Sequence, residues 1–199
     1  MLCFEANLTK QEEKARDIMV YLFNPVLKFI LMTSNYEEFK RYGFNSCRQT
    51  AILGASYLKK LLPDYDFHVY EGHFVEKIDG KATPYDHAFI VAINDKEQRH
   101  LVIDLSRTSK KLIFMEAQDN LYPQIEDYQD VIKIGQDLID LDEMINTDEP
   151  EYFTGLKPLV VLKMIDTLIE ELKMASKSEQ LYFCKHIYKK TTMLGGEVF

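Results

Sequence analysis

The alternation of apolar and polar residues divides the chain into helical segments at its ends and a run of strands between them. Apolar residues recur at helical spacing over residues 10–22, which predicts an amphipathic helix. Thr9 is its expected N-cap, and Glu12, three residues on, completes a capping-box pattern. Pro25 is expected to end this helix or to start the next element. The apolar stretch Val26–Met32 predicts a buried helical piece.

The middle of the chain predicts one helix followed by strands. Residues 47–62 carry apolar side chains at helical spacing, with Cys47 in the first turn and Pro63 as the stop. Three segments rich in β-branched and aromatic residues follow, and they are Phe67–Glu76, His87–Ile93 and Leu101–Leu105. Asp79-Gly80 marks a turn after the first, and the polar loop Asn94–Arg99 joins the other two.

Further along, the pattern predicts more helix than strand. The expected elements are a short strand and then a helix over residues 131–146, and helices over 158–173 and 178–190. Helices followed by consecutive strands and then helices indicate an α+β fold. We expect a single domain over residues 1–199, with a core of about 36–115 and a C-terminal helical extension of about 131–190.

Composition narrows the class of protein. The N-terminal residues lack a basic start followed by an apolar run of signal length, and Lys28 interrupts the apolar stretch Pro25–Met32, which is too short to span a bilayer. The three cysteines are an odd number at wide spacing, unlike a disulfide framework or a zinc site. We therefore expect a cytoplasmic protein with no metal, no cofactor and no membrane association.

Charge is distributed unevenly. The formal net charge is −8, and residues 116–151 alone hold twelve carboxylates against one lysine. No basic run is interleaved with aromatic residues, so nucleic-acid binding is not expected. The acidic segment is interpreted as a solvated connector, or else as a rim that attracts a cationic substrate.

Cys47 is the candidate nucleophile. A cysteine reacts as its thiolate, which the positive end of a helix dipole and a neighbouring imidazolium both favour. Among the five histidines, His87 stands at the start of an apolar strand, where an imidazole without a purpose or a partner is costly to bury.

Asp104 is the expected partner of His87, because it is the only carboxylate in its own apolar strand. A hairpin that pairs residue 92 with residue 99 sets position 87 opposite position 104. Registers shifted by two residues keep both side chains on one face as diagonal neighbours, whereas a shift of one separates them. Taken singly, a strand histidine, a strand aspartate or a helix cysteine is more typical of a structural role. Together, the three predict a nucleophile, a base and an orienting acid.

Residues 47–106 resemble the catalytic core of the transglutaminase-like cysteine peptidase superfamily, which has a papain-like fold. The segments that carry the resemblance are Asp86-His87-Ala88-Phe89-Ile90-Val91 and Val102-Ile103-Asp104-Leu105-Ser106. The resemblance implies that Cys47 is the nucleophile, His87 the general base and acid, and Asp104 the orienter. It implies a peptidase, deamidase or transglutaminase acting on the amide of a peptide or protein substrate.

Two departures from that superfamily keep other functions open. Arg48 follows the nucleophile where many transglutaminases have an aromatic residue. Phe44-Asn45-Ser46 replaces the Arg-Gly-Gly of the arylamine N-acetyltransferases, which share the same order of residues. The alternatives are a small-molecule N-acyltransferase of that type and a catalytically idle binding module.

The remaining polar residues give weaker indications. Asn45, Asn35 and the backbone N–H of Cys47 are candidates for the oxyanion donor. Arg48 and Arg107 could hold a substrate carboxylate, although surface roles are commoner. His68 and His73 fall on opposite strand faces, so a shared metal site is not expected, and Cys184-x-His186 is interpreted as packing.

Overall fold

The computed structural model describes residues 3–34, 46–78, 81–106, 112–117, 131–147 and 155–194, and its elements form an α+β fold. The strands are β1 (Cys3–Ala6), β2 (Asp66–Ile78), β3 (Lys81–Asn94), β4 (Arg99–Asp104), β5 (Leu112–Ala117) and β6 (Val131–Ile139). The helices are α1 (Lys10–Ile18), η1 (Met19–Phe23), α2 (Asn24–Ser34), α4 (Cys47–Leu61), α5 (Leu141–Asn146), α6 (Pro158–Met174) and α7 (Lys177–Leu194). The predicted helices and the three predicted central strands are confirmed. The predicted turn at Asp79-Gly80 lies outside the described residues.

The first helix is longer than the sequence predicts. The capping box is confirmed, since the Thr9 side chain accepts from the Glu12 backbone and the Glu12 side chain accepts from that of Thr9. Pro25 does not end the helix but stands at the second position of α2, the other alternative that the sequence left open, and the π-helical turn η1 joins α1 to α2 without a break. Proline has no N–H to give to the carbonyl four residues back, which is that of Tyr21. The Cys184 thiol of α7 donates to this carbonyl over 2.7 Å.

Residues 10–34 thus form one helix that has the length and composition of a membrane span. Its most apolar window has a mean hydropathy of 1.3, but 67% of that window is buried inside the protein. Such burial is typical of the core helix of a globular domain, and α6 and α7 lie against it. Apolarity here is therefore explained by packing within the chain.

The six strands form one sheet in the order β1-β5-β4-β3-β2-β6. Five of them pair in antiparallel fashion, and β1 lies parallel to β5 at one edge. The β3–β4 hairpin takes one of the registers shifted by two residues from the pairing of 92 with 99, because Ala92 pairs with Leu101. The turn is shorter than expected: the Asn94 side chain accepts from the Glu97 backbone over 3.2 Å, and Gln98 takes a positive φ of 52°.

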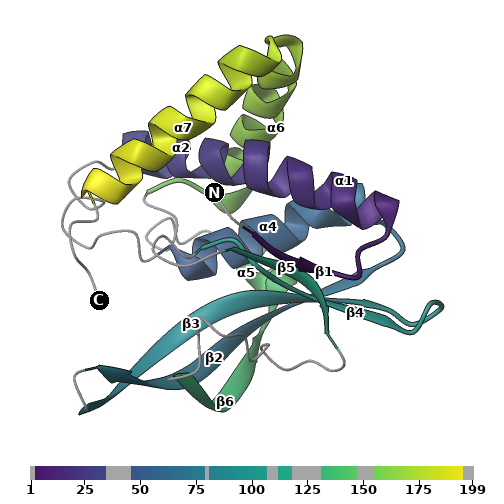
Figure 1. The fold of residues 1–199 in the computed structure, drawn as a ribbon, viewed down its shortest axis with the longest axis vertical. Coiled ribbons are helices and arrows are strands. Elements are labelled where there is room, and N and C mark those ends of the chain that lie inside the picture. The colour runs from purple at the N-terminus through teal and green to yellow at the C-terminus, as the bar shows by residue number, and fades with distance from the viewer. Residues whose placement is uncertain are drawn as a thin grey trace.

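Helix α4 lies between the sheet and the layer of α1, α2, α6 and α7 (Figure 1). Residues at alternate positions of β3, such as Ala88 and Ile90, point into this main core. Gly54 allows α4 to approach β3 closely, because a Cβ there would lie 3.1 Å from the Ile90 side chain. The predicted C-terminal extension contributes Ile165 and Ile169 of α6 to the same core.

A buried ion pair fixes α1 to the sheet. The Glu12 side chain is 1% exposed and accepts from Arg99 of β4 over 3.0 and 2.9 Å. Tyr65 also donates to Glu12. Burial raises the pKa of Glu12, but the hydrogen bonds from Arg99, Tyr65 and Thr9 hold it below its ordinary value.

Candidate active site

Cys47 is the first residue of α4, as predicted. Ser46 precedes the helix, and its carbonyl accepts the first bond, from Thr50 over 2.8 Å. The Ser46 side chain makes no capping hydrogen bond. The amide of Cys47 belongs to the first turn, whose N–H groups have no acceptor within the helix and point along the positive end of its dipole. The half-buried Cys47 therefore occupies a position that favours a negative charge.

His87 of β3 and Asp104 of β4 lie on adjacent antiparallel strands. The β3–β4 ladder ends at the pair Ile90–Ile103, and its register makes His87 and Asp104 the diagonal neighbours that a two-residue shift predicts. His87 Nε2 and Asp104 Oδ2 are 2.8 Å apart, and both residues are buried. The Phe74 ring meets the His87 ring edge-on with 6.4 Å between centroids. This packing restricts the orientation of the imidazole.

The Cys47 thiol and the His87 imidazole are hydrogen-bonded to each other. The same imidazole faces Asp104 through Nε2, so it lies between the thiol and the carboxylate. Burial raises the pKa of Cys47, but the hydrogen bond and charge of His87 and an N–H from Ala88 bring it below its ordinary value. Burial lowers the pKa of His87, whereas the charge and hydrogen bond of Asp104 raise it above its ordinary value. Both shifts favour a thiolate–imidazolium pair.

Ser106 is a site residue that the sequence did not single out. Its hydroxyl donates to Asp104 Oδ1 over 2.7 Å, and its backbone N–H donates to the same oxygen over 3.1 Å. The hydroxyl oxygen also lies 3.4 Å from His87 Nε2. Asp104 thus accepts from Ser106 on one carboxylate oxygen and faces His87 with the other. The signal in the sequence was a hydroxyl residue two positions after the strand aspartate, which is typical of a local side-chain-to-backbone turn.

Lys28 adds a second charge to the surroundings of Asp104. It lies on α2 with 1% of its surface exposed, among the largest fully buried side chains of the described residues. Burial lowers its pKa to about 8, and the negative charge of Asp104 acts in the opposite direction. A cation on this side favours the ionised form of Asp104.

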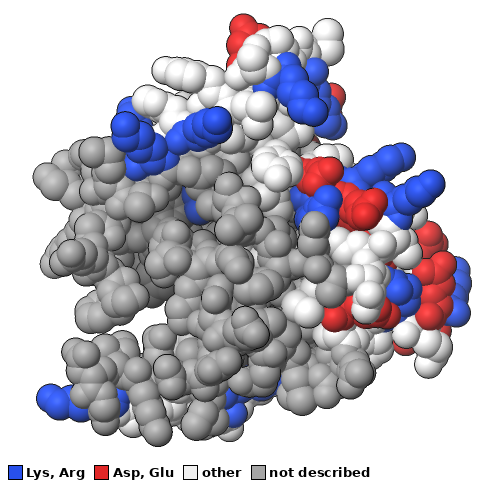
Figure 2. Space-filling model, in the orientation of Figure 1, with Lys and Arg blue, Asp and Glu red and all other residues white. Residues whose placement is uncertain are grey.

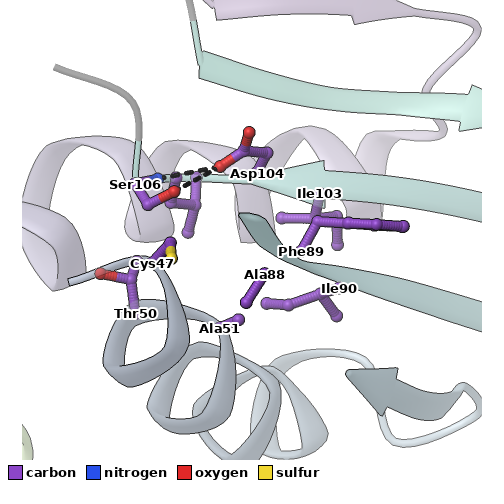
Figure 3. A pocket seen from close by; sticks show the side chains of 10 residues that line it. Cys47, Thr50, Ala51, Ala88, Phe89, Ile90, Ile103, Asp104 and Ser106 are labelled. Carbon is purple, nitrogen blue, oxygen red and sulfur yellow. Dashed lines mark hydrogen bonds between the residues drawn. The ribbon is translucent and has the colours of Figure 1, made fainter. Parts of the chain in front are cut away.

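Cys47 and Thr50 lie on one side of a narrow hollow, with Asp104 and Ser106 on the other (Figure 3). The arrangement can generate a thiolate, hold its conjugate acid and stabilise that acid with a buried carboxylate. The candidate oxyanion side chains Asn45 and Asn35 lie outside the described residues, so the backbone N–H of Cys47 is the described candidate. Among the described residues, no group of three His, Cys, Asp or Glu side chains is placed to hold a metal ion.

Other predicted residues lie elsewhere. Arg48 is bound to Glu71 of β2, while Arg107 is outside the described residues. His73 lies between Asp86 and Asp137 on the sheet surface, at 2.7 and 2.9 Å. This contact raises the pKa of His73 above its ordinary value. The packing interpretation holds for Cys184, which is buried, whereas His186 is exposed and stacks on the Tyr182 ring.

The acidic segment is described only in part, because residues 118–130 and 148–154 lie outside the described ranges. Figure 2 shows Lys and Arg interspersed with Asp and Glu on the side of the molecule where α1 begins. The rim interpretation of residues 116–151 therefore stays a prediction.

Comparison with protein-family models, with curated proteins and with solved structures gives no significant match to this chain.

Proposed function

We propose that this protein is a cysteine-dependent acyl-transfer enzyme that acts on the amide of a peptide or protein, on a fold of the transglutaminase-like, papain-like type. The observation that carries the proposal is the continuous hydrogen-bonded series from Cys47 through His87 to Asp104. A helix-start cysteine held against a buried imidazole, itself held by a buried carboxylate, is the arrangement that nucleophilic catalysis requires. The resemblance of residues 47–106 to that superfamily supports the same assignment.

In the proposed reaction, the Cys47 thiolate attacks the carbonyl carbon of the substrate amide. The new C–S bond forms as the carbonyl electrons move to oxygen, and backbone N–H groups at the start of α4 stabilise the oxyanion. The His87 imidazolium then donates its proton to the leaving nitrogen, the C–N bond breaks, and a thioester remains on Cys47. Asp104 stabilises the imidazolium before this transfer.

The thioester is resolved by water or by an amine. Neutral His87 takes a proton from the attacking group, the C–S bond breaks, and the thiolate–imidazolium pair is restored. Water gives hydrolysis or deamidation, and an amine gives transamidation. All three outcomes pass through one acyl-enzyme.

The test is to trap that intermediate. The protein is incubated with peptide p-nitroanilides and, separately, with phenyl thioacetate, and intact-mass measurement follows acylation of Cys47. Acylation and turnover with the amides, both absent in Cys47→Ala, support the proposal. Reaction with the thioester alone favours a small-molecule acyltransferase. A Cys47 that alkylates rapidly but is acylated by neither substrate favours an idle binding module.

A further inference from the structure

The first turn of α4 is tied to the sheet by an ion pair next to the nucleophile. Arg48 Nε donates to Glu71 Oε1 over 2.8 Å, and its Nη2 donates to Oε2. Two parallel bonds between a guanidinium and a carboxylate fix both distance and orientation. The side chain of Glu71 is only 16% exposed, so this pair is less screened by solvent than an ordinary surface ion pair.

Glu71 lies beside the two residues that contact Cys47. On the adjacent strand β3 it pairs directly with Ala88, whose backbone N–H reaches the Cys47 sulfur. The next residue of β2, Gly72, pairs with His87. The Arg48–Glu71 bond therefore joins the element that carries the nucleophile to the part of the sheet that carries the base.

Two features that commonly stabilise the start of a helix are missing from α4. Ser46 supplies no capping hydrogen bond, and no acidic residue lies in the first turn. A cation at this end of a helix is opposed by the helix dipole. Arg48 is thus unfavourable for the helix by itself, and Glu71 provides the compensating charge.

We propose that the Arg48–Glu71 ion pair is a positioning clamp that holds the Cys47 sulfur within hydrogen-bond distance of His87. The inference rests on the proposed function, because it concerns the activation of the same thiol. Arg48 and Glu71 are positioning residues in this assignment and do not contact the reacting atoms. Loss of either partner lets the first turn of α4 move and weakens the Cys47–His87 hydrogen bond.

The direction in which each substitution changes the pKa of Cys47 distinguishes a positioning clamp from a through-space charge effect. Removing the positive charge in Arg48→Met disfavours the thiolate by either route. Removing the negative charge in Glu71→Gln favours the thiolate through space but disfavours it if the clamp is lost. A clamp therefore predicts that both variants raise the pKa of Cys47.

The experiment measures the rate of Cys47 alkylation by iodoacetamide from pH 5 to pH 9, with thermal unfolding recorded in parallel. We expect Arg48→Met and Glu71→Gln each to slow alkylation at pH 6 by about 3–10-fold, as for a pKa rise of about half to one unit. The charge-reversed double variant Arg48→Glu with Glu71→Arg should recover part of that loss. Lys60→Met is the matched control, because Lys60 binds Asp166 over 2.6 Å from the other end of α4.

Faster alkylation in Glu71→Gln, or equal rates in wild type and both single variants, would overturn the clamp. Either result leaves the proposed function standing if wild-type Cys47 alkylates rapidly at pH 6. Slow alkylation of the wild type would instead remove the proposed function and the clamp together. A loss of rate in Lys60→Met equal to that in Glu71→Gln would show general destabilisation of α4, and this too would overturn the clamp.

Discussion

His87 and Asp104 lie on neighbouring antiparallel strands, out of direct register by two residues, and their side chains meet with 2.8 Å between Nε2 and Oδ2. This diagonal placement follows from the register of the two strands, in which Ile90 pairs with Ile103. Ser106 is the second residue after the end of β4. Its hydroxyl oxygen lies 3.4 Å from the same nitrogen, Nε2 of His87. The two strands therefore build the charged part of the site by their register alone.

Replacing Asp104 by Asn should weaken the activation of Cys47 without abolishing it. The neutral amide no longer stabilises the imidazolium, so the pKa of His87 falls and the thiolate loses its counter-ion. We expect alkylation of Cys47 at pH 6 to slow by about 10–100-fold, and acyl transfer to fall at least as much. His87→Ala should be more severe. Equal reactivity of Asp104→Asn and wild type would contradict the orienting role.

Ser106→Ala should have a smaller effect of the same sign. The variant loses the hydroxyl donor at 2.7 Å but keeps the backbone donor at 3.1 Å, so Asp104 stays partly held. We expect a reduction of about 3–10-fold in acyl transfer, as for the loss of one hydrogen bond to a charged group. Ser106→Thr should retain the hydroxyl and most of the activity.

Ser176→Ala is the matched control for that variant. The hydroxyl of Ser176 donates to the Glu179 carboxylate over 2.6 Å on the exposed surface. Ser176 is also distant in sequence from the residues of the candidate site. Its loss should leave acyl transfer unchanged. If Ser106→Ala also left acyl transfer unchanged, Ser106 would have no positioning role.

The Glu12–Arg99 pair should dominate the acid sensitivity of folding. The folded-state pKa of Glu12 lies below its ordinary value of 4.5, so its contribution is complete above pH 4.5 and is lost as the pH falls through the lowered value. Glu12→Gln should cost about 3–5 kcal/mol at pH 7, because it leaves the Arg99 guanidinium without its carboxylate. Urea unfolding at pH 7 and pH 4 measures both quantities. The wild type should lose more stability than Glu12→Gln between those values, and equal losses would contradict this account.

Local chemistry made much of the fold predictable. The Thr9–Glu12 capping box, the start of α4 at Cys47 and the apolar strands follow from residues that are close in sequence. The unbroken passage of the helix through Pro25 was not predictable locally, because the thiol that donates to the Tyr21 carbonyl, that of Cys184, lies 163 residues away. Strand β1 was missed because four residues carry too little pattern and pair with β5 only in the folded chain.

The three central residues of the candidate site were predictable from the sequence, but the residues that surround and support them were not. The order of the three residues along the chain and the strand face expected for each were sufficient to select Cys47, His87 and Asp104. The pairing of 92 with 99 and the registers shifted from it by two residues all place His87 and Asp104 on one face. The role of Ser106 depends on the actual register, which the four-residue turn at 95–98 decides. The Arg48–Glu71 contact joins a helix to a strand 23 residues later, and sequence spacing does not specify it.

The pH dependence of alkylation at each cysteine tests the central claim, that His87 holds Cys47 as a thiolate. Iodoacetamide rates are measured in the native protein by peptide mass spectrometry, with the buried Cys184 as the internal reference, because burial raises its pKa. The lowered pKa of Cys47 predicts faster alkylation at pH 6 and a rate that levels off at a lower pH than for an ordinary thiol. The rate should fall only as the pH drops through that lowered value, and His87→Ala should remove the effect. A Cys47 rate at pH 6 no faster than that of Cys184, still rising about tenfold per pH unit toward the ordinary thiol range, would contradict the account.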